Sequence, residues 1–280
     1  MESIITLRKS IDTRLVQLEV KARPRNLYEP IGYLLALGGK RFRPLLVLLT
    51  AQLRGTQNPK ALDPALAVEV FHNFTLMHDD IMDAAPLRRG QPSVHEKWNQ
   101  NTAILSGDAL FTTAYQALET APSRHLPALL KLFNRTSMEV CEGQQLDLEF
   151  ENKSDVTQAM YLEMIRLKTS VLLACSCAMG AICSGASQER INLWYEFGEK
   201  LGLAFQIQDD YLDTFGVEST TGKKVGGDIL ADKKTFLFIH AVSSGELPDT
   251  DGFDDEQKVQ AIRAQMHARG SDLAAKNLMK

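Results

Sequence analysis

The sequence predicts an all-α protein that folds as a single-domain helical bundle. Apolar residues recur at three- and four-residue intervals through several long segments, as on the buried face of an amphipathic helix. Glycine and proline stand at positions where helices are expected to stop or to start. We find no strand-like alternation of any length and no glycine-rich dinucleotide motif.

The composition is that of a globular protein with one large core. The chain has 280 residues, of which 44% are hydrophobic and 24% are charged. Such a chain need not be divided, so we expect one domain over residues 1–280. The formal net charge of −4 argues against a general nucleic-acid binder.

Cysteine spacing and apolar runs predict a cytoplasmic protein. The four cysteines lack the paired spacing of a zinc site, and three lie in an apolar helical segment, so we expect buried free thiols. The N-terminal residues lack the order of charge, apolar core and cleavage site that is typical of a signal peptide. The most apolar run, residues 171–183, is shorter than the roughly 20 residues needed to span a bilayer. No transmembrane segment is expected.

Three helices are expected before the most informative part of the chain. Residues 3–22 carry apolar side chains at helical spacing. A second helix over residues 27–37 should stop at Gly38, because glycine accepts the left-handed conformation at helix ends. Pro44 then opens a third helix that runs through Leu53.

A fourth, longer helix ends in an acidic motif. Asp63 supplies a helix cap, Pro64 stands at the first helical position, and apolar periodicity predicts a helix over residues 64–83. Near its end Asp79 and Asp83 are four positions apart and share one face, a spacing at which like charges repel.

The three aspartates of this motif, Asp79, Asp80 and Asp83, suit a hard cation. Mg²⁺ usually takes one or two carboxylates and fills its other positions with water and substrate phosphate. The motif therefore indicates a diphosphate ligand, although a solvated acidic turn would look the same. The same spacing recurs as Asp209, Asp210 and Asp213, at the end of a helix expected over residues 187–215. Two copies, each followed by basic residues, are hard to explain as solvated surface.

Basic residues cluster at two places near the first motif. Lys40, Arg41 and Arg43 follow a glycine turn at a helix start, where backbone N–H groups and the helix dipole favour a phosphate. The alternative is an ordinary basic turn. Arg88 and Arg89 follow the motif, either as plain charge compensation or as a clamp on the same phosphate oxygens as Mg²⁺.

Three further features are weaker. His72 lies two helical turns before Asp79 and either helps to hold an anion or is an ordinary core histidine. Lys168 precedes nearly all-apolar sequence, so it should have an anionic partner. Residues 216–234 are glycine- and lysine-rich without apolar periodicity, which predicts a loop and a candidate lid over a charged ligand.

The other elements are expected to be helical. Ser93 and Glu96 have the spacing of a capping box. A helix over residues 101–121 should be interrupted near Gly107, and Ser154-Asp155 should cap a helix that runs to Ala181. The remaining helices are expected over residues 124–150 and 235–242 and, after an acidic connector, in two short segments that close the chain.

Taken in order, these motifs resemble those of the trans-isoprenyl diphosphate synthases. The resemblance spans about residues 38–240 and is carried by Gly39–Pro44, the two acidic motifs, Arg88-Arg89-Gly90, Lys168-Thr169, Phe205-Gln206 and the segment from Gly222-Lys223 to Lys233-Lys234-Thr235. It implies the isoprenoid synthase fold, an all-α bundle around a deep central cavity, usually in a homodimer.

The resemblance also implies a role for each motif residue. Three Mg²⁺ ions would be held by Asp79, Asp83 and Asp209, with Asp80, Asp210 and Asp213 completing the two motifs. The allylic diphosphate would be held by Arg88, Lys168, Lys233 and Lys223. Isopentenyl diphosphate would be bound by Lys40, Arg43, His72 and Arg89. The allylic cation would be stabilised by Thr169 and Gln206.

The implied reaction begins with loss of the allylic diphosphate. The isopentenyl double bond then attacks the cation, and the departing pyrophosphate takes the proton, so no protein base is required. Phe74, five residues before Asp79, and its neighbour Thr75 would form the floor that limits product length. By resemblance an aromatic residue there favours a C20 product, with C15 next; the alternative is that Phe74 is ordinary core.

Two other functions share parts of this pattern. A class I terpene cyclase has the same fold and first motif, but its second site normally mixes Asn, Ser or Thr with an acid, and it has no use for Lys40 and Arg43. A non-catalytic synthase subunit usually loses aspartates, whereas all six are present here.

Overall fold

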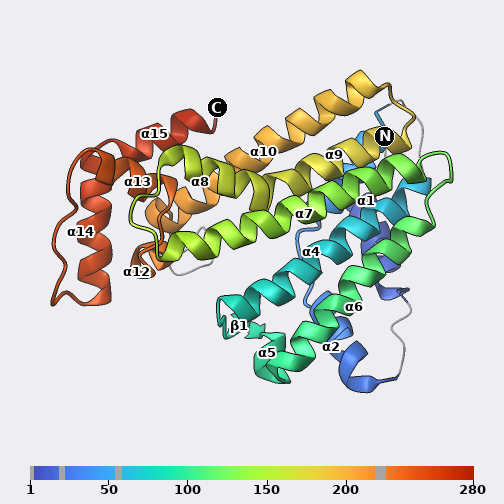
Figure 1. Ribbon diagram of the computed structural model, residues 1–280, viewed down its shortest axis with the longest axis horizontal. Helices are drawn as coiled ribbons and strands as arrows, with labels where there is room; N and C mark the ends of the chain where they lie inside the picture. Colours follow the sequence, from blue (N-terminus) through green and yellow to red (C-terminus); the bar gives the residue numbers. More distant parts are fainter. Residues whose placement is uncertain (1–2, 19–22, 54–58, 218–224) are drawn as a thin grey trace. The chain divides into compact units, whose positions relative to one another are not determined.

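The computed structural model describes residues 3–18, 23–53, 59–217 and 225–280 (Figure 1). Within these ranges the regular elements are helices, apart from one hairpin of two two-residue strands, so the all-α prediction is confirmed. The N-terminal elements are α1 (Ile4–Val16), α2 (Arg25–Ala36), α3 (Phe42–Ala51), η1 (Pro59–Ala61), α4 (Leu62–Met82), β1 (Leu87–Arg88), β2 (Gln91–Pro92), α5 (Val94–Lys97) and α6 (Gln100–Glu119). The later elements are α7 (Leu126–Glu151), α8 (Gln158–Ile165), η2 (Arg166–Ser170), α9 (Val171–Cys183), α10 (Gln188–Phe215), α12 (Gly227–Leu230), α13 (Phe236–Ser243), α14 (Asp255–Ala268) and α15 (Ser271–Leu278).

The chain divides into two compact units. Unit 1 comprises Met1–Asn134 and Cys175–Tyr195, and unit 2 comprises Arg135–Ala174 and Glu196–Lys280. The boundaries between them fall within α7, α9 and α10. The first acidic motif therefore belongs to unit 1 and the second to unit 2. A single domain with a central cavity stays a prediction.

Unit 1 is organised around α4. This helix lies side by side with α6, and α1 and α3 also pack against it (Figure 1). The middle of its apolar face, with Leu66, Val70 and Phe71, is fully buried. Helix α6 runs unbroken, so the interruption expected near Gly107 is wrong. Deep burial of one face of α4 holds its acidic C-terminal end in a fixed position.

Several predicted helix starts differ from the structure. Asp63 does not cap α4, because the turn η1 leads into the helix and Ala61 stands at the N-cap. Instead Asp63 forms an ion pair with Arg14 of α1 at 3.1 Å. Ser93 is the N-cap of α5 but makes no side-chain cap hydrogen bond. Helix α8 is capped by Thr157, whose hydroxyl accepts from the next turn at 3.2 Å, and not by Ser154-Asp155.

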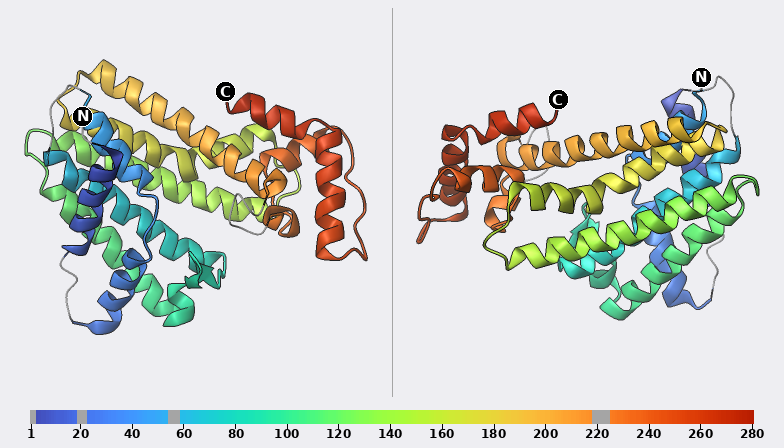
Figure 2. Two further views of the ribbon diagram at one scale, coloured as in Figure 1. Left: turned by 180° about the vertical axis from the view of Figure 1, so that it is seen from behind. Right: turned by 45° about the horizontal axis from the view of Figure 1, so that its top comes forward.

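The core of unit 2 is built from α8 and the C-terminal helices. Helices α13, α14 and α15 contact one another, and α13 also packs on α8 (Figure 2). Buried Tyr161, Leu237 and Met266 fill the space between them. Asp254 and Gln257 form a capping box at the start of α14. The two closing helices are therefore present as predicted.

A continuous helical run from α8 through η2 to α9 is longer and more apolar than the sequence alone indicated. Residues Gln158–Cys183 form the one described helix long and apolar enough to cross a membrane, and 83% of its apolar window is buried. Such burial is also what the core helix of a globular protein shows. Cys175, Cys177 and Cys183 are buried and free as expected, whereas free Cys141 is exposed.

Candidate active site

The first acidic motif lies at the C-terminal end of α4, with Asp83 as its C-cap. Asp79 is half-buried and Asp83 is exposed. Asp80, in contrast, is only 1% exposed, and its Oδ1 accepts hydrogen bonds from Nε of Arg88 at 2.9 Å and from Nη2 of the same side chain. The three aspartates therefore differ: Asp80 is occupied by an arginine inside the protein, and the motif reaches solvent through Asp79 and Asp83.

A tight hairpin places the two arginines that follow the motif. Strands β1 and β2 pair antiparallel, and the two residues between them, Arg89 and Gly90, have φ of 55° and 76°. Positive φ at both central residues is the pattern of a type I′ turn. Arg88 thereby returns to Asp80, while the guanidinium of Arg89 lies against Gly39, where an added Cβ would be 3.0 Å from Nη2.

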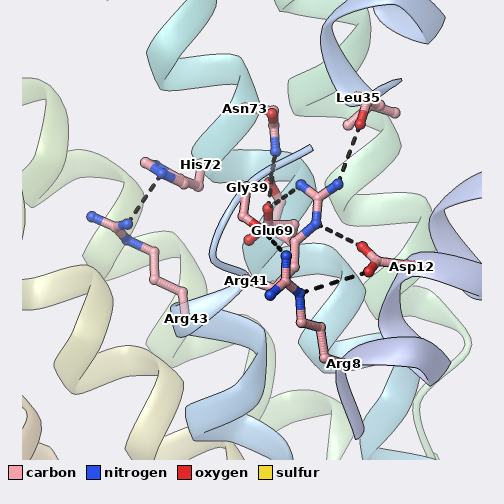
Figure 3. Close-up of polar contacts among 9 residues, drawn as sticks. All are labelled: Arg8, Asp12, Leu35, Gly39, Arg41, Arg43, Glu69, His72 and Asn73. Carbon is pink, nitrogen blue, oxygen red and sulfur yellow. Dashed lines mark hydrogen bonds and ion pairs between the residues drawn. The ribbon is translucent and has the colours of Figure 1, made fainter. Parts of the chain in front are cut away.

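The predicted anion-binding residues of α3 and α4 meet in unit 1. Nη1 of Arg43 lies 3.1 Å from Nε2 of His72 (Figure 3). Burial, followed by the positive charge of Arg43, holds the pKa of His72 well below its usual value, so the ring is neutral and Nε2 accepts from Arg43. Burial also lowers the pKa of Arg43 to about 10, which leaves it charged at neutral pH. Lys40 is exposed.

The second acidic motif lies on α10 in unit 2. Asp210 is buried, accepting from the Tyr161 hydroxyl through Oδ2 and from the Gln206 amide through Oδ1 at 3.1 Å. Burial raises the pKa of Asp210 to about 7, against the effect of these hydrogen bonds. Asp209 is exposed, and Asp213 is held from the other side, since its Oδ2 accepts from the backbone N–H of Asp228 at 2.9 Å.

Lys168 and Thr169 lie in the π-helical turn η2, which is where the helical run of unit 2 departs from α geometry. Single π-turns inside α-helices often mark functional sites because they redirect side chains. Here Nζ of Lys168 pairs with Asp147 of α7 at 2.5 Å, and the Thr169 hydroxyl donates to Oε1 of Gln206 at 3.1 Å. The structure thus brings together Thr169 and Gln206, the two residues predicted to stabilise a cation.

Close packing of α7 sets the position of this turn. A Cβ added to Gly143 would lie 2.2 Å from the backbone nitrogen of Lys168 and 2.6 Å from the carbonyl carbon of Leu167. Only glycine allows the two backbones to approach so closely.

Sequence reasoning missed several residues around the second motif. Asp228, beside the motif, has its pKa raised to about 6, mainly by burial and then by the carboxylates Asp213, Asp209 and Asp147. Asp147 of α7, which pairs with Lys168, comes from a segment that the sequence analysis assigned only as a helix. Tyr161 had no signal, because its partner lies far away in sequence. Lys233 is exposed, and Lys223 lies outside the described residues.

The donor set fits magnesium with a phosphate ligand. Among the described residues, no three His, Cys, Asp or Glu side chains form a closed metal site. Mg²⁺ does not require one, since it is usually held by one or two carboxylates together with substrate phosphates and water. The outer aspartates, by which we mean Asp79 and Asp83 of the first motif and Asp209 of the second, have carboxylates suited to that kind of partial, oxygen-only coordination.

The predicted floor residue Phe74 belongs to an aromatic cluster. Its ring stacks on Phe111 of α6 at 5.1 Å between centroids and also contacts Phe71 at 5.5 Å and His78 at 4.8 Å. The Thr75 hydroxyl donates to the carbonyl oxygen of His72 at 2.9 Å. Phe74 is half-buried, so it is supported on one side by other rings without being part of the closed core.

Comparison with known proteins identifies the family of the chain. The polyprenyl synthetase family model matches residues 24–266. The chain is 42% identical over 238 residues to a geranylgeranyl diphosphate synthase of Methanosarcina mazei, covering 84% of this chain and 73% of that protein. It is 40% identical to a geranylfarnesyl diphosphate synthase of Natronomonas pharaonis, covering 88% and 77% of the two chains. A crystal structure of a geranylgeranyl pyrophosphate synthase superposes with a TM-score of 0.93 and 43% identity, covering 100% of this chain and 89% of that one. The chain belongs to the polyprenyl synthetase family of prenyltransferases and has its all-α fold.

Proposed function

We propose that this protein joins isopentenyl diphosphate to an allylic diphosphate and releases pyrophosphate, with C20 geranylgeranyl diphosphate as the main product. The observation that carries the proposal is the presence of two separate cationic groups in unit 1. Arg88 is bound to the acidic motif through Asp80, whereas the charged Arg43 of α3 is held by the neutral ring of His72, two helical turns before Asp79 on α4. An enzyme that binds two diphosphates requires two such groups, and one that binds a single diphosphate does not.

The proposed metal ligands are the outer aspartates Asp79, Asp83 and Asp209, holding three Mg²⁺ ions with the allylic diphosphate. Bound Mg²⁺ would neutralise the charge that develops on the diphosphate as the C–O bond breaks. Asp80 and Asp210 take supporting roles in this proposal, because each is buried and bound to a protein donor. Asp213 likewise supports the segment that carries Asp228.

The protein's own groups complete the proposed reaction by electrostatics. Arg88, Lys168 and Lys233, with Lys223, compensate the leaving diphosphate. The side-chain oxygen atoms of Thr169 and Gln206 are linked by a hydrogen bond. They stabilise the developing positive charge of the allylic cation, because both present electron lone pairs to it. Lys40, Arg43, His72 and Arg89 hold isopentenyl diphosphate. No protein nucleophile takes part, and pyrophosphate accepts the proton that is lost after condensation.

Support for the product length comes from Phe74 and from the relatives. Phe74 is backed by the ring of Phe111, so a growing prenyl chain that reaches it would meet a rigid aromatic pair. Two of the similar proteins carry the names geranylgeranyl and geranylfarnesyl diphosphate synthase. We infer C20 as the main product and C15 as the next in this proposal. A homodimer in the cytoplasm is the assembly proposed from the resemblance.

Product analysis tests the proposal. The protein is incubated with Mg²⁺, isopentenyl diphosphate and, in separate reactions, C5, C10 and C15 allylic diphosphates, and products are identified by mass spectrometry. We expect a C20 diphosphate in Mg²⁺-containing reactions and none after chelation. A cyclase would instead convert one allylic diphosphate to a hydrocarbon or alcohol without isopentenyl diphosphate. Absence of any chain elongation would contradict the proposal.

A further inference from the structure

Arg41 has an unusual backbone conformation and an unusual environment. It stands at the N-cap of α3 with φ of 53°, in the left-handed region that residues other than glycine rarely adopt. Its side chain is nevertheless buried, with only 5% of the residue exposed. Such strain persists only when surrounding contacts over-determine the conformation, and it is concentrated at functional sites.

Three separate elements hold the Arg41 guanidinium (Figure 3). Its Nη1 donates to Oε1 of buried Glu69 on α4 at 2.7 Å, and its Nε donates to Oδ1 of Asp12 on α1 at 2.9 Å. Its Nη2 donates to the carbonyl oxygen of Leu35, near the end of α2, at 3.3 Å. Through the rigid fork of its guanidinium, Arg41 thereby connects α1, α2 and α4 to the start of α3.

Helix α1 contacts the same turn a second time. Nη2 of Arg8 donates to the carbonyl oxygen of Gly39 at 3.0 Å, and Arg8 also lies 3.9 Å from Asp12, one helical turn further along α1. The residues on both sides of Lys40 are therefore tied to α1, Gly39 through its carbonyl oxygen and Arg41 through its side chain. The guanidinium of Arg89 also packs against Gly39.

The turn that these contacts hold carries the cations assigned to isopentenyl diphosphate. Arg43 lies two residues after Arg41 and donates to His72 (Figure 3). Lys40 stands in the sequence between the two tied residues, Gly39 and Arg41. We propose that Asp12 and Glu69 are positioning residues, which act through Arg41 to set the isopentenyl diphosphate subsite, and that α1 is therefore a functional part of that subsite. The inference rests on the proposed function, because it assigns this turn to the second substrate.

Plain structural stabilisation by a buried ion pair predicts a different result from positioning. Stabilisation alone would leave both Michaelis constants unchanged in any variant that still folds. Positioning predicts a selective loss of affinity for isopentenyl diphosphate. Asp12 is suited to separate the two, because its side chain is 46% exposed and its removal leaves Arg41 paired with Glu69.

The first experiment compares Asp12→Asn with Arg14→Gln. Both remove an ion pair between α1 and another element, but the Arg14–Asp63 pair, at 3.1 Å, does not touch the turn. We expect Asp12→Asn to raise KM for isopentenyl diphosphate about 10-fold, as for loss of one charge-assisted hydrogen bond. The kcat and the KM for the allylic diphosphate should stay within about two-fold of wild type, as should every constant of Arg14→Gln. Equal changes in both Michaelis constants, or none, would overturn the inference.

Direct binding keeps this test independent of turnover. Isopentenyl diphosphate is titrated by calorimetry into wild-type protein, Asp12→Asn and Glu69→Gln without allylic substrate, and folding is checked by circular dichroism. Weaker binding in the folded variants supports the inference, and unchanged Kd overturns it. If wild type binds isopentenyl diphosphate but forms no elongated product, the proposed function fails while the positioning role stands. If Glu69→Gln does not fold, Asp12→Asn decides.

Discussion

Nε2 of His72 accepts a hydrogen bond from Nη1 of Arg43 at 3.1 Å, and the ring is neutral when it does so. Burial is the main cause of the depressed His72 pKa, and four nearby arginines, Arg43 first, add to it. A neutral imidazole fixes the guanidinium of Arg43 without neutralising its charge. Arg43 therefore keeps its full positive charge for a phosphate.

The neutral ring makes stability depend on pH. Because the folded-state pKa of His72 is below the unfolded value of about 6.5, its contribution is complete above that pH and is lost as the pH falls. We expect up to about 1.4 kcal/mol of lost stability per pH unit from this group below pH 6.5. Urea unfolding at several pH values should show a shallower acid slope in His72→Gln. An acid slope in His72→Gln equal to that of wild type would contradict the prediction.

Removal of an outer aspartate should abolish most of the activity. We expect Asp79→Ala or Asp209→Ala to lower kcat by at least about 10³-fold, which is the effect of losing a strong electrostatic stabiliser. Turnover is measured at saturating Mg²⁺ and substrates, with melting temperature as a check on folding. Asp108→Ala and Asp155→Ala, at exposed aspartates of the same two units, serve as controls and should be near normal. Near-normal rates in either motif variant would remove that residue from the metal site.

Truncation of Phe74 should lengthen the product. The ring of Phe74 stacks on Phe111 of α6, so Phe74→Ala opens space against α6, five residues before the acidic motif begins. One turn of helix is about 5.4 Å, on the order of one isoprene unit. Mass spectrometry should therefore detect C25 or longer diphosphates. Phe253→Ala, at an exposed phenylalanine, should leave the product unchanged. An unaltered product in Phe74→Ala would exclude it from the floor.

Gly143→Ala should displace the π-turn. The added methyl group would lie 2.2 Å from the backbone nitrogen of Lys168, and backbone atoms cannot move aside as a side chain does. We expect a loss of about 1–3 kcal/mol in unfolding free energy, as for overpacking, together with a clear fall in kcat. The matched control is Gly32→Ala, since nothing lies within 4 Å of the added Cβ on helix α2. If Gly143→Ala has the stability and rate of wild type, the turn does not depend on this contact.

Tyr161→Phe should affect both folding and the metal requirement. The substitution removes the hydroxyl that donates to Asp210. Leaving a buried acceptor without its donor lowers the free energy of unfolding by about 1–3 kcal/mol. Because that hydrogen bond lowers the pKa of Asp210, its loss raises this pKa further, and half-maximal turnover should require more Mg²⁺. Tyr115→Phe, which removes a hydroxyl that donates to Asn134, is the control. An unchanged unfolding free energy and Mg²⁺ titration would show that Asp210 needs no donor from Tyr161.

The sequence by itself determined the helices and the chemistry of the motifs. Helical periodicity and the spacing of aspartates are local properties, so residues 64–83 and 187–215 could be assigned almost correctly without coordinates. The helix stop at Gly38 follows from one residue's conformational preference, and its φ of 77° agrees. Helix caps were less predictable, because Asp63 is drawn into an ion pair with another helix.

Only the tertiary structure decided which members of each motif are buried and what holds them. Asp80 and Asp210 occupy equivalent places in the two motifs, but one is bound by Arg88 and the other by Tyr161. The link from Asp12 through Arg41 to Glu69 joins three segments that no local pattern relates. Burial and pairing depend on which helix packs against which, and that is a property of the whole fold and not of any one stretch of sequence.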